Sequence, residues 1–221
     1  MLIGTERVQM NRIAMNVIQE ILLHPEEYFR SYSLEEKGWR LPLLVVLCVG
    51  IFAGIGAWLA SSMVLPLLPP EARSMGPLMG IIGFLSTFIV IFLIWIFYTL
   101  VFYIISHLLK GTGSFKETLA VVGIGYLPQI FGTLLTTIMM AVYLPTIRIT
   151  SIAGIEDAMR SSPMVMMSGI LGLIFLLWSA NIWIFGVAKV RSLEKKQAIF
   201  VVGLPVFLYL IYALATSFGL L

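Results

Sequence analysis

Five long apolar runs follow one another along the chain and are separated by short polar segments. They lie near residues 41–63, 79–109, 118–143, 164–188 and 198–220. Each run has roughly 20 residues or more, which is enough for an α-helix rising 1.5 Å per residue to cross about 30 Å of hydrocarbon. The second run is longer than a span needs, which predicts a tilt or a projection beyond the bilayer. The pattern predicts an all-α integral membrane protein, with a compact bundle of five transmembrane helices over residues 41–221.

The first 40 residues have a different pattern and are expected to form an amphipathic cytoplasmic segment. Residues 8–24 place apolar side chains three and four apart on one side of a helix, at Met10, Ile13, Ala14, Val17, Ile18 and Ile21. Such a helix would lie in the membrane interface or against a partner. Pro25 is expected to begin a second short helix. An aromatic belt before the first span is predicted from Tyr28, Phe29, Tyr32 and Trp39. No short apolar stretch follows a basic start, so a cleaved signal peptide is not expected.

Charge is scarce and unevenly placed. Charged residues make up 11% of the chain, less than half the share of soluble domains. With five spans, eleven of the fourteen Lys and Arg fall on the side of the N-terminus. The positive-inside rule therefore predicts a cytoplasmic N-terminus and an external C-terminus. All ionisable residues lie outside the centres of the five runs, which argues against a proton-coupled transporter or pump but leaves a passive pore open.

Residues suited to catalysis are few. Neither His24 nor His107 lies in an H-E-x-x-H motif, and no Cys/His cluster suits zinc. An intramembrane serine hydrolase would need His107 to meet Ser168 or Ser179 from another helix. The alternative is a histidine at the headgroup level with a hydrated tip. We expect a protein that is not an enzyme, holds no metal or cofactor and binds no nucleic acid.

The segment KGTGSFKE, residues 110–117, begins with G-x-G and could suggest a phosphate-binding loop. It lacks the G-x-x-x-x-G-K-[ST] pattern, and it follows a predicted membrane helix rather than a strand. The stretch from Ser114 to Glu117 instead matches the S-x-x-E capping box. Gly111 and Gly113 would permit the positive-φ turn that ends the preceding helix. The segment predicts a tight cytoplasmic hairpin, where a lipid phosphate could also bind at the helix start near Lys110 and Lys116.

Three polar side chains are candidates for the bundle interior: Tyr126, Gln129 and Asn181. Gln129 follows Pro128, which cannot donate to the residue four back and so predicts a kink. The kink either has its freed carbonyl satisfied by a neighbour or opens a gap that lines a cavity. Asn181 is expected either to hydrogen-bond across the bundle or to contact a substrate or lipid.

Small residues recur on single faces of four runs and predict close helix packing. The stripes are Gly50, Gly54, Ala57 and Ser61; Gly76, Gly80, Gly83 and Thr87; Gly125, Gly132 and Thr136; and Ser168, Gly172, Ser179 and Gly186.

Several motifs resemble those of the Yip1 domain family in its short prokaryotic form, over residues 18–220. ILLHPEEYFR is similar to the family's entry motif, GTGSFKETLAVVGIGYLP to its Gly-rich loop and third span, and SLEKKQAIFVVGLP to its basic loop before the last span. The chain lacks the long N-terminal tail and the D-L-Y-G-P motif of eukaryotic members, so their binding of lipidated small GTPases is not carried over. The resemblance brings no catalytic residues and implies the cell membrane of a prokaryote.

Two functions remain open at this point. The first is a membrane organiser or adaptor that acts through its cytoplasmic face, formed by residues 8–30 and the turns at 111–117 and 189–196. The second is a small passive channel or lipid/solute carrier lined by Tyr126, Gln129 and Asn181. The expected partners are membrane lipids, a protein at the cytoplasmic face and a second copy of the chain.

Overall fold

The computed structural model describes residues 17–146 and 162–217, and within these ranges the chain is helical with no strand. Residues 17–23 are helical and are followed by α2 (Pro25–Arg30), α3 (Leu34–Lys37), α4 (Arg40–Val64), η1 (Leu65–Leu67), α5 (Pro70–Arg73), α6 (Gly76–Leu108), α7 (Phe115–Gly125), α8 (Leu127–Tyr143), η2 (Leu144–Thr146), α10 (Pro163–Val190) and α11 (Lys195–Ser217). The all-α prediction is confirmed.

Four helices of the described chain are long and apolar enough to cross a membrane: α4 with η1, α6, α10 and α11. Helices α7 and α8, with 11 and 17 residues, are each too short alone and pass the same test only as a pair, which is bent by 41°. They make the fifth predicted span if the bent pair crosses as one. The predicted runs agree with these helices to within three residues at each end.

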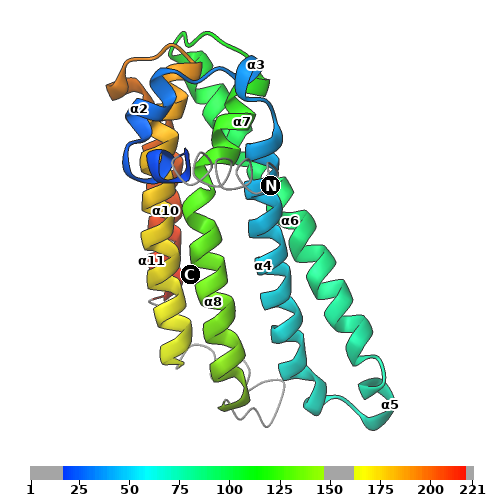
Figure 1. Ribbon diagram of the computed structural model, residues 1–221. Coiled ribbons are helices and arrows are strands. Elements are labelled where there is room, and N and C mark those ends of the chain that lie inside the picture. Colours follow the sequence, from blue (N-terminus) through cyan, green and yellow to red (C-terminus); the bar gives the residue numbers. More distant parts are fainter. Residues whose placement is uncertain (1–16, 147–161, 218–221) are drawn as a thin grey trace, which may run out of the picture.

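The helices run roughly side by side, and most of their polar turns gather at one end of the bundle (Figure 1). This end, called the basic end below, carries α2, α3, the α6–α7 turn and the α10–α11 turn. Its described cations are Arg30, Lys37, Arg40, Lys110, Lys116, Lys189, Arg191, Lys195 and Lys196, whereas the described part of the opposite end has Arg73 alone. The two ends therefore differ in their number of described Lys and Arg residues, which is the quantity that the orientation prediction uses.

The short helix α7 forms the centre of the basic end. It packs against α4, α6 and α10, and every residue from Ala120 to Pro128 is buried. Around it, α4 packs along α6 and α8, and α10 packs along α8 and α11. The positions of the two turns at this end are thus set by a buried helix rather than by surface loops.

Close helix approach occurs at several of the predicted small residues. A Cβ at Gly54 would lie 2.8 Å from the Phe84 ring, and one at Gly132 would lie 2.8 Å from the Phe175 ring. The stripe predicted for α10 is only partly correct. Gly186 packs tightly, but Gly172 has open space where a Cβ would stand.

The N-terminal segment packs on the bundle where it is described. Residues 8–16 lie outside the described residues, so the amphipathic helix is tested only over 17–23, where Ile21 is fully buried. The indole of Trp178 in α10 donates to the carbonyl of Leu22 at 3.0 Å. Helix α2 begins at Pro25 as predicted.

The predicted aromatic belt is wrong for three of its four residues. Tyr28, Phe29 and Tyr32 are 1%, 1% and 5% exposed. Their rings pack on one another at centroid distances of 5.1 to 6.0 Å, and α2 packs against α10. These rings fill the core of the basic end because α2 folds back onto the bundle.

Candidate functional site

One arginine connects the two turns of the basic end. Arg191 follows the last residue of α10 and is only 1% exposed. Its Nε donates to the Ser106 hydroxyl at 2.8 Å, its Nη2 donates to the Gly111 carbonyl at 2.9 Å, and its Nη1 donates to the Gly113 carbonyl. The guanidinium carbon lies 4.3 Å from the centroid of the Tyr103 ring, in cation–π geometry. The charge of this buried guanidinium is thus stabilised by three oxygen acceptors and an aromatic face.

The backbone of both turns suits this arrangement. Lys110, two residues after the end of α6, has φ 63°, and Ser192, two residues after the end of α10, has φ 50°. In each turn, the N–H of the next residue bonds the carbonyl five residues back, as in a Schellman motif. The amide of Thr112 also donates to the carbonyl of Arg191 at 3.0 Å. Main-chain and side-chain hydrogen bonds therefore hold the two turns together. We call the cluster of Arg191 with Ser106, Gly111, Thr112 and Gly113 the Arg191 node.

The predicted capping box begins α7 beside the node. The Ser114 amide donates to the Glu117 carboxylate at 2.8 Å, and the Glu117 amide donates to the Ser114 hydroxyl at 3.2 Å. The tight hairpin is confirmed, with Gly113 at φ 89°. The prediction is wrong for Gly111, because the positive-φ residue directly after α6 is Lys110. Lys116 is exposed, whereas Gly111 is buried. Burial raises the pKa of Tyr32 to about 12, and the nearby charge of Glu117 adds to the rise.

The bend between α7 and α8 is closed by a neighbouring side chain. The amide of Tyr126 bonds the carbonyl of Gly123, three residues back, so the α-helical partner of the Val122 carbonyl is lost. The buried indole of Trp183 donates to that carbonyl at 2.8 Å. Tyr126 packs on the same indole with ring centroids 5.4 Å apart. The Val122 carbonyl at the bend is thus satisfied, whereas the carbonyl that Pro128 leaves free is that of Ile124, and the two alternatives stated for it remain a prediction.

The three predicted interior residues do not form one polar site. Tyr126 is buried and its hydroxyl has no hydrogen-bond partner within the described chain, whereas Gln129 is half-buried. Asn181 is exposed, so its placement in the interior is wrong. The packed face of α10 carries Ser179 and Trp183, and a residue two positions from each points to nearly the opposite side of a helix.

Two kinds of site considered from the sequence, a serine–histidine pair and a metal site, can be compared with the described residues. His107 is exposed, and the buried Ser179 hydroxyl has no hydrogen-bond partner among them, so the considered serine–histidine pair is not formed. No group of three His, Cys, Asp or Glu in the described ranges could hold a metal ion.

Sequence reasoning missed the main residue of the site. Arg191 was counted only as one of several cations in a basic turn, and Ser106 and Tyr103 were not singled out as its partners. The bonded groups are 78 to 85 residues from Arg191 along the chain. No local pattern distinguishes this arginine from the lysines around it.

Comparison with known families now gives the architecture a name. The sequence matches the Yip1 domain over residues 20–217. The chain belongs to the Yip1 family. An uncharacterised protein of the archaeon Methanocaldococcus jannaschii is 36% identical over 124 residues, which cover 56% of this chain and 87% of that protein. No solved structure matches the chain. The resemblance read from the motifs is confirmed, and the archaeal relative agrees with a prokaryotic-type Yip1 protein.

Proposed function

We propose that this Yip1 protein is a non-enzymatic membrane organiser or adaptor that acts through its basic end, which faces the cytoplasm of a prokaryotic cell. The observation that carries the proposal is the Arg191 node. It fixes the α6–α7 turn to the α10–α11 turn through a buried cation. A surface that is rigid before it meets a partner loses less conformational entropy on binding.

Exposed side chains complete this surface. Thr112 is exposed in the α6–α7 turn, and Lys116 and Lys196 are exposed in the first turns of α7 and α11. The two lysines present positive charge beside the buried cation. Such a surface suits an acidic partner, since complementary charge raises the association rate and disfavours wrong partners.

Site-specific photocrosslinking in intact cells tests the adaptor role. A crosslinking residue at Lys116 is expected to give a discrete protein adduct, while one at Ser74, exposed at the opposite end, gives none of that mass. An adduct of twice the chain mass would identify a second copy as the partner. The same adducts from both positions, or none from Lys116, would contradict the proposal.

A second candidate, the passive channel or carrier, is supported by one groove. It has a volume of about 300 Å³ between α4, α8 and α10 and is lined by Ala53, Gly56, Ala57, Ala60, Thr133, Thr136, Thr137, Met140, Met164 and Ser168. Gln129 lies one helical turn from Thr133 on the same face of α8.

Flux from proteoliposomes distinguishes the two candidates. We expect no solute or lipid flux above that of empty vesicles, for the wild type or for Gln129→Leu. Flux that the wild type supports and this variant loses would replace the adaptor role by the carrier role. Circular dichroism would establish that both proteins are folded.

A further inference from the structure

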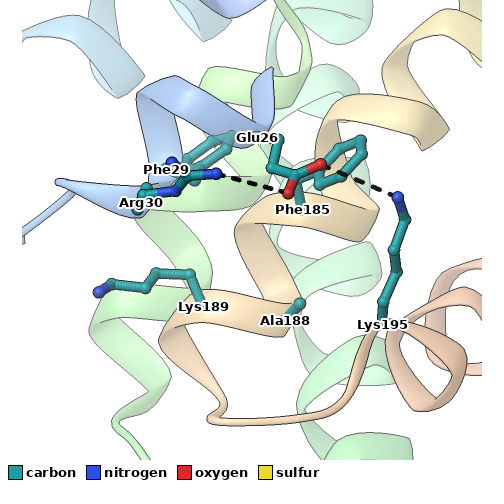
Figure 2. Close-up of a pocket in the computed structure, with 7 residues that line it drawn as sticks. All are labelled: Glu26, Phe29, Arg30, Phe185, Ala188, Lys189 and Lys195. Atoms are coloured by element: carbon teal, nitrogen blue, oxygen red, sulfur yellow. Dashed lines mark ion pairs between the residues drawn. The ribbon is translucent and has the colours of Figure 1, made fainter. Parts of the chain in front are cut away.

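A second groove at the basic end lies between α2 and the adjoining ends of α10 and α11 (Figure 2). It has a volume of about 280 Å³ and is lined by Glu26, Phe29, Arg30, Phe185, Ala188, Lys189 and Lys195. The aromatic rings and Ala188 provide apolar surface, and the charged groups surround it. We propose that this groove binds the phosphate of one anionic phospholipid, whose chains follow the outer face of α10.

The charges around the groove favour an anion. Arg30, Lys189 and Lys195 contribute three cations against the single carboxylate of Glu26. Glu26 lies 3.7 Å from Arg30 and 3.9 Å from Lys195, and all three side chains are more than half exposed. Exposed ion pairs of this kind are weak. Lys189 has no ion pair within the described part of the chain. A phosphate would thus meet one cation without an ion pair, Lys189, and two that are held only in weak pairs.

The position of the groove, at the ends of two membrane-spanning helices, favours a lipid over a soluble anion. Lys189 lies in the last turn of α10, and Lys195 begins α11, so both stand where membrane spans end. Basic pockets between span ends are where anionic headgroups bind. The Lys195 ammonium lies 4.5 Å from the centroid of the Phe185 ring. A lysine of this kind keeps its apolar stem on the protein and its charge at the headgroup level.

Asn181 gives a second, independent reason for a lipid. It lies four residues before Phe185, hence on the same side of α10 and about 6 Å deeper along the axis. It is exposed, and its side chain has no hydrogen-bond partner within the described ranges. The same face continues with the exposed apolar Leu177 and Ile174. An amide facing the bilayer needs a partner, and the ester carbonyls of a lipid bound in the groove would accept its N–H.

This inference deepens the proposed function by giving the basic end a lipid ligand, but the two can fail separately. Loss of the Lys116 protein adduct would refute the adaptor role and leave lipid binding intact. Loss of lipid selectivity in the groove would leave the protein adduct intact.

Native mass spectrometry of the purified full chain tests the site, by titration with phosphatidylglycerol and with phosphatidylcholine of the same chains. Arg30→Gln/Lys189→Gln is expected to weaken phosphatidylglycerol binding by roughly 25-fold, at about fivefold per cation. Lys110→Gln/Lys116→Gln removes the same charge from the α6–α7 turn and should change it by less than about twofold. Glu26→Gln removes the opposing charge and should strengthen binding about fivefold.

Three results would overturn the proposal. Equal losses in the two double variants would indicate diffuse attraction to the whole basic end. Displacement of the lipid by millimolar inorganic phosphate would indicate a site for a soluble anion. Asn181→Leu keeps every charge and should weaken phosphatidylglycerol binding about fivefold. Unchanged binding in this variant would place the lipid elsewhere.

Discussion

Replacing Arg191 by methionine keeps an unbranched side chain but removes three charge-assisted hydrogen bonds. Such bonds contribute about 1.5–3 kcal/mol each in favourable cases, and part of this is offset because the guanidinium is no longer desolvated. The Ser106 hydroxyl and the carbonyls of Gly111 and Gly113 would lose this donor at a site where Arg191 is 1% exposed. We expect a loss of about 3–5 kcal/mol in the free energy of unfolding. Arg191→Lys keeps the charge but not the planar, forked set of N–H donors, and should lower the free energy of unfolding by about 2 kcal/mol.

The single cysteine gives a direct assay. Cys48 lies half-buried in α4, so a thiol-reactive fluorescent dye reports unfolding when the purified protein is heated. At about 2–4 °C per kcal/mol, the melting temperature of Arg191→Met should fall by roughly 6–20 °C. Lys196→Met removes the same charge from an exposed position nearby and should shift it by less than about 2 °C. Equal shifts in the two variants would refute the role assigned to Arg191.

Three further predictions use the same melting assay. Gly125→Ala should cost about 1–3 kcal/mol, because a Cβ there overlaps a packed indole, while Gly172→Ala, with open space at the Cβ, should be neutral or slightly stabilising. Ser114→Ala should cost about 1 kcal/mol through loss of the capping box, whereas Ser162→Ala, at a helix start without a side-chain cap bond, should cost less. Below pH 10, near the ordinary pKa of 10.0, Tyr32 should make the free energy of unfolding no more dependent on pH. As the pH rises from there through about 12, the free energy of unfolding should fall, because Tyr32 ionises in the unfolded chain before it ionises in the folded one. The corresponding curve of Tyr32→Phe should be flatter.

Features fixed by neighbouring residues could be predicted from the sequence. The spans follow from the length of the apolar runs, and the start of α7 follows from Ser114 and Glu117, which are three residues apart. The bend at Pro128 follows from its missing N–H. Each of these is set within about one helical turn or by the thickness of a bilayer, so no knowledge of distant contacts is needed.

Features that depend on which helices meet could not be predicted. The burial of Arg191 requires two turns about 80 residues apart to come together. Tyr28 and Phe29 were expected at the membrane surface because nothing local indicates that α2 folds back against α10. For Asn181, polarity alone suggests an interior position, but helical periodicity puts the residue nearly opposite the buried Ser179, and the structure shows it exposed.

The availability of polar groups is the physical difference between the two candidate regions. In the groove between α4, α8 and α10, Thr133 donates to the Gln129 carbonyl at 2.7 Å, Thr136 donates to Gly132 at 3.0 Å, and Thr137 donates to Phe52 at 3.0 Å. These hydroxyls already donate to backbone carbonyls. A solute that left its water behind in this groove would have to displace those bonds before it could accept a hydrogen bond from the hydroxyls. By contrast, Lys189 at the basic end and the exposed Asn181, deeper along α10, have no such bonds in the described chain. A ligand that brings its own acceptors therefore breaks no bond within the described chain there, and this is why the basic end, with the adjoining face of α10, is a better candidate for recognition than the bundle interior.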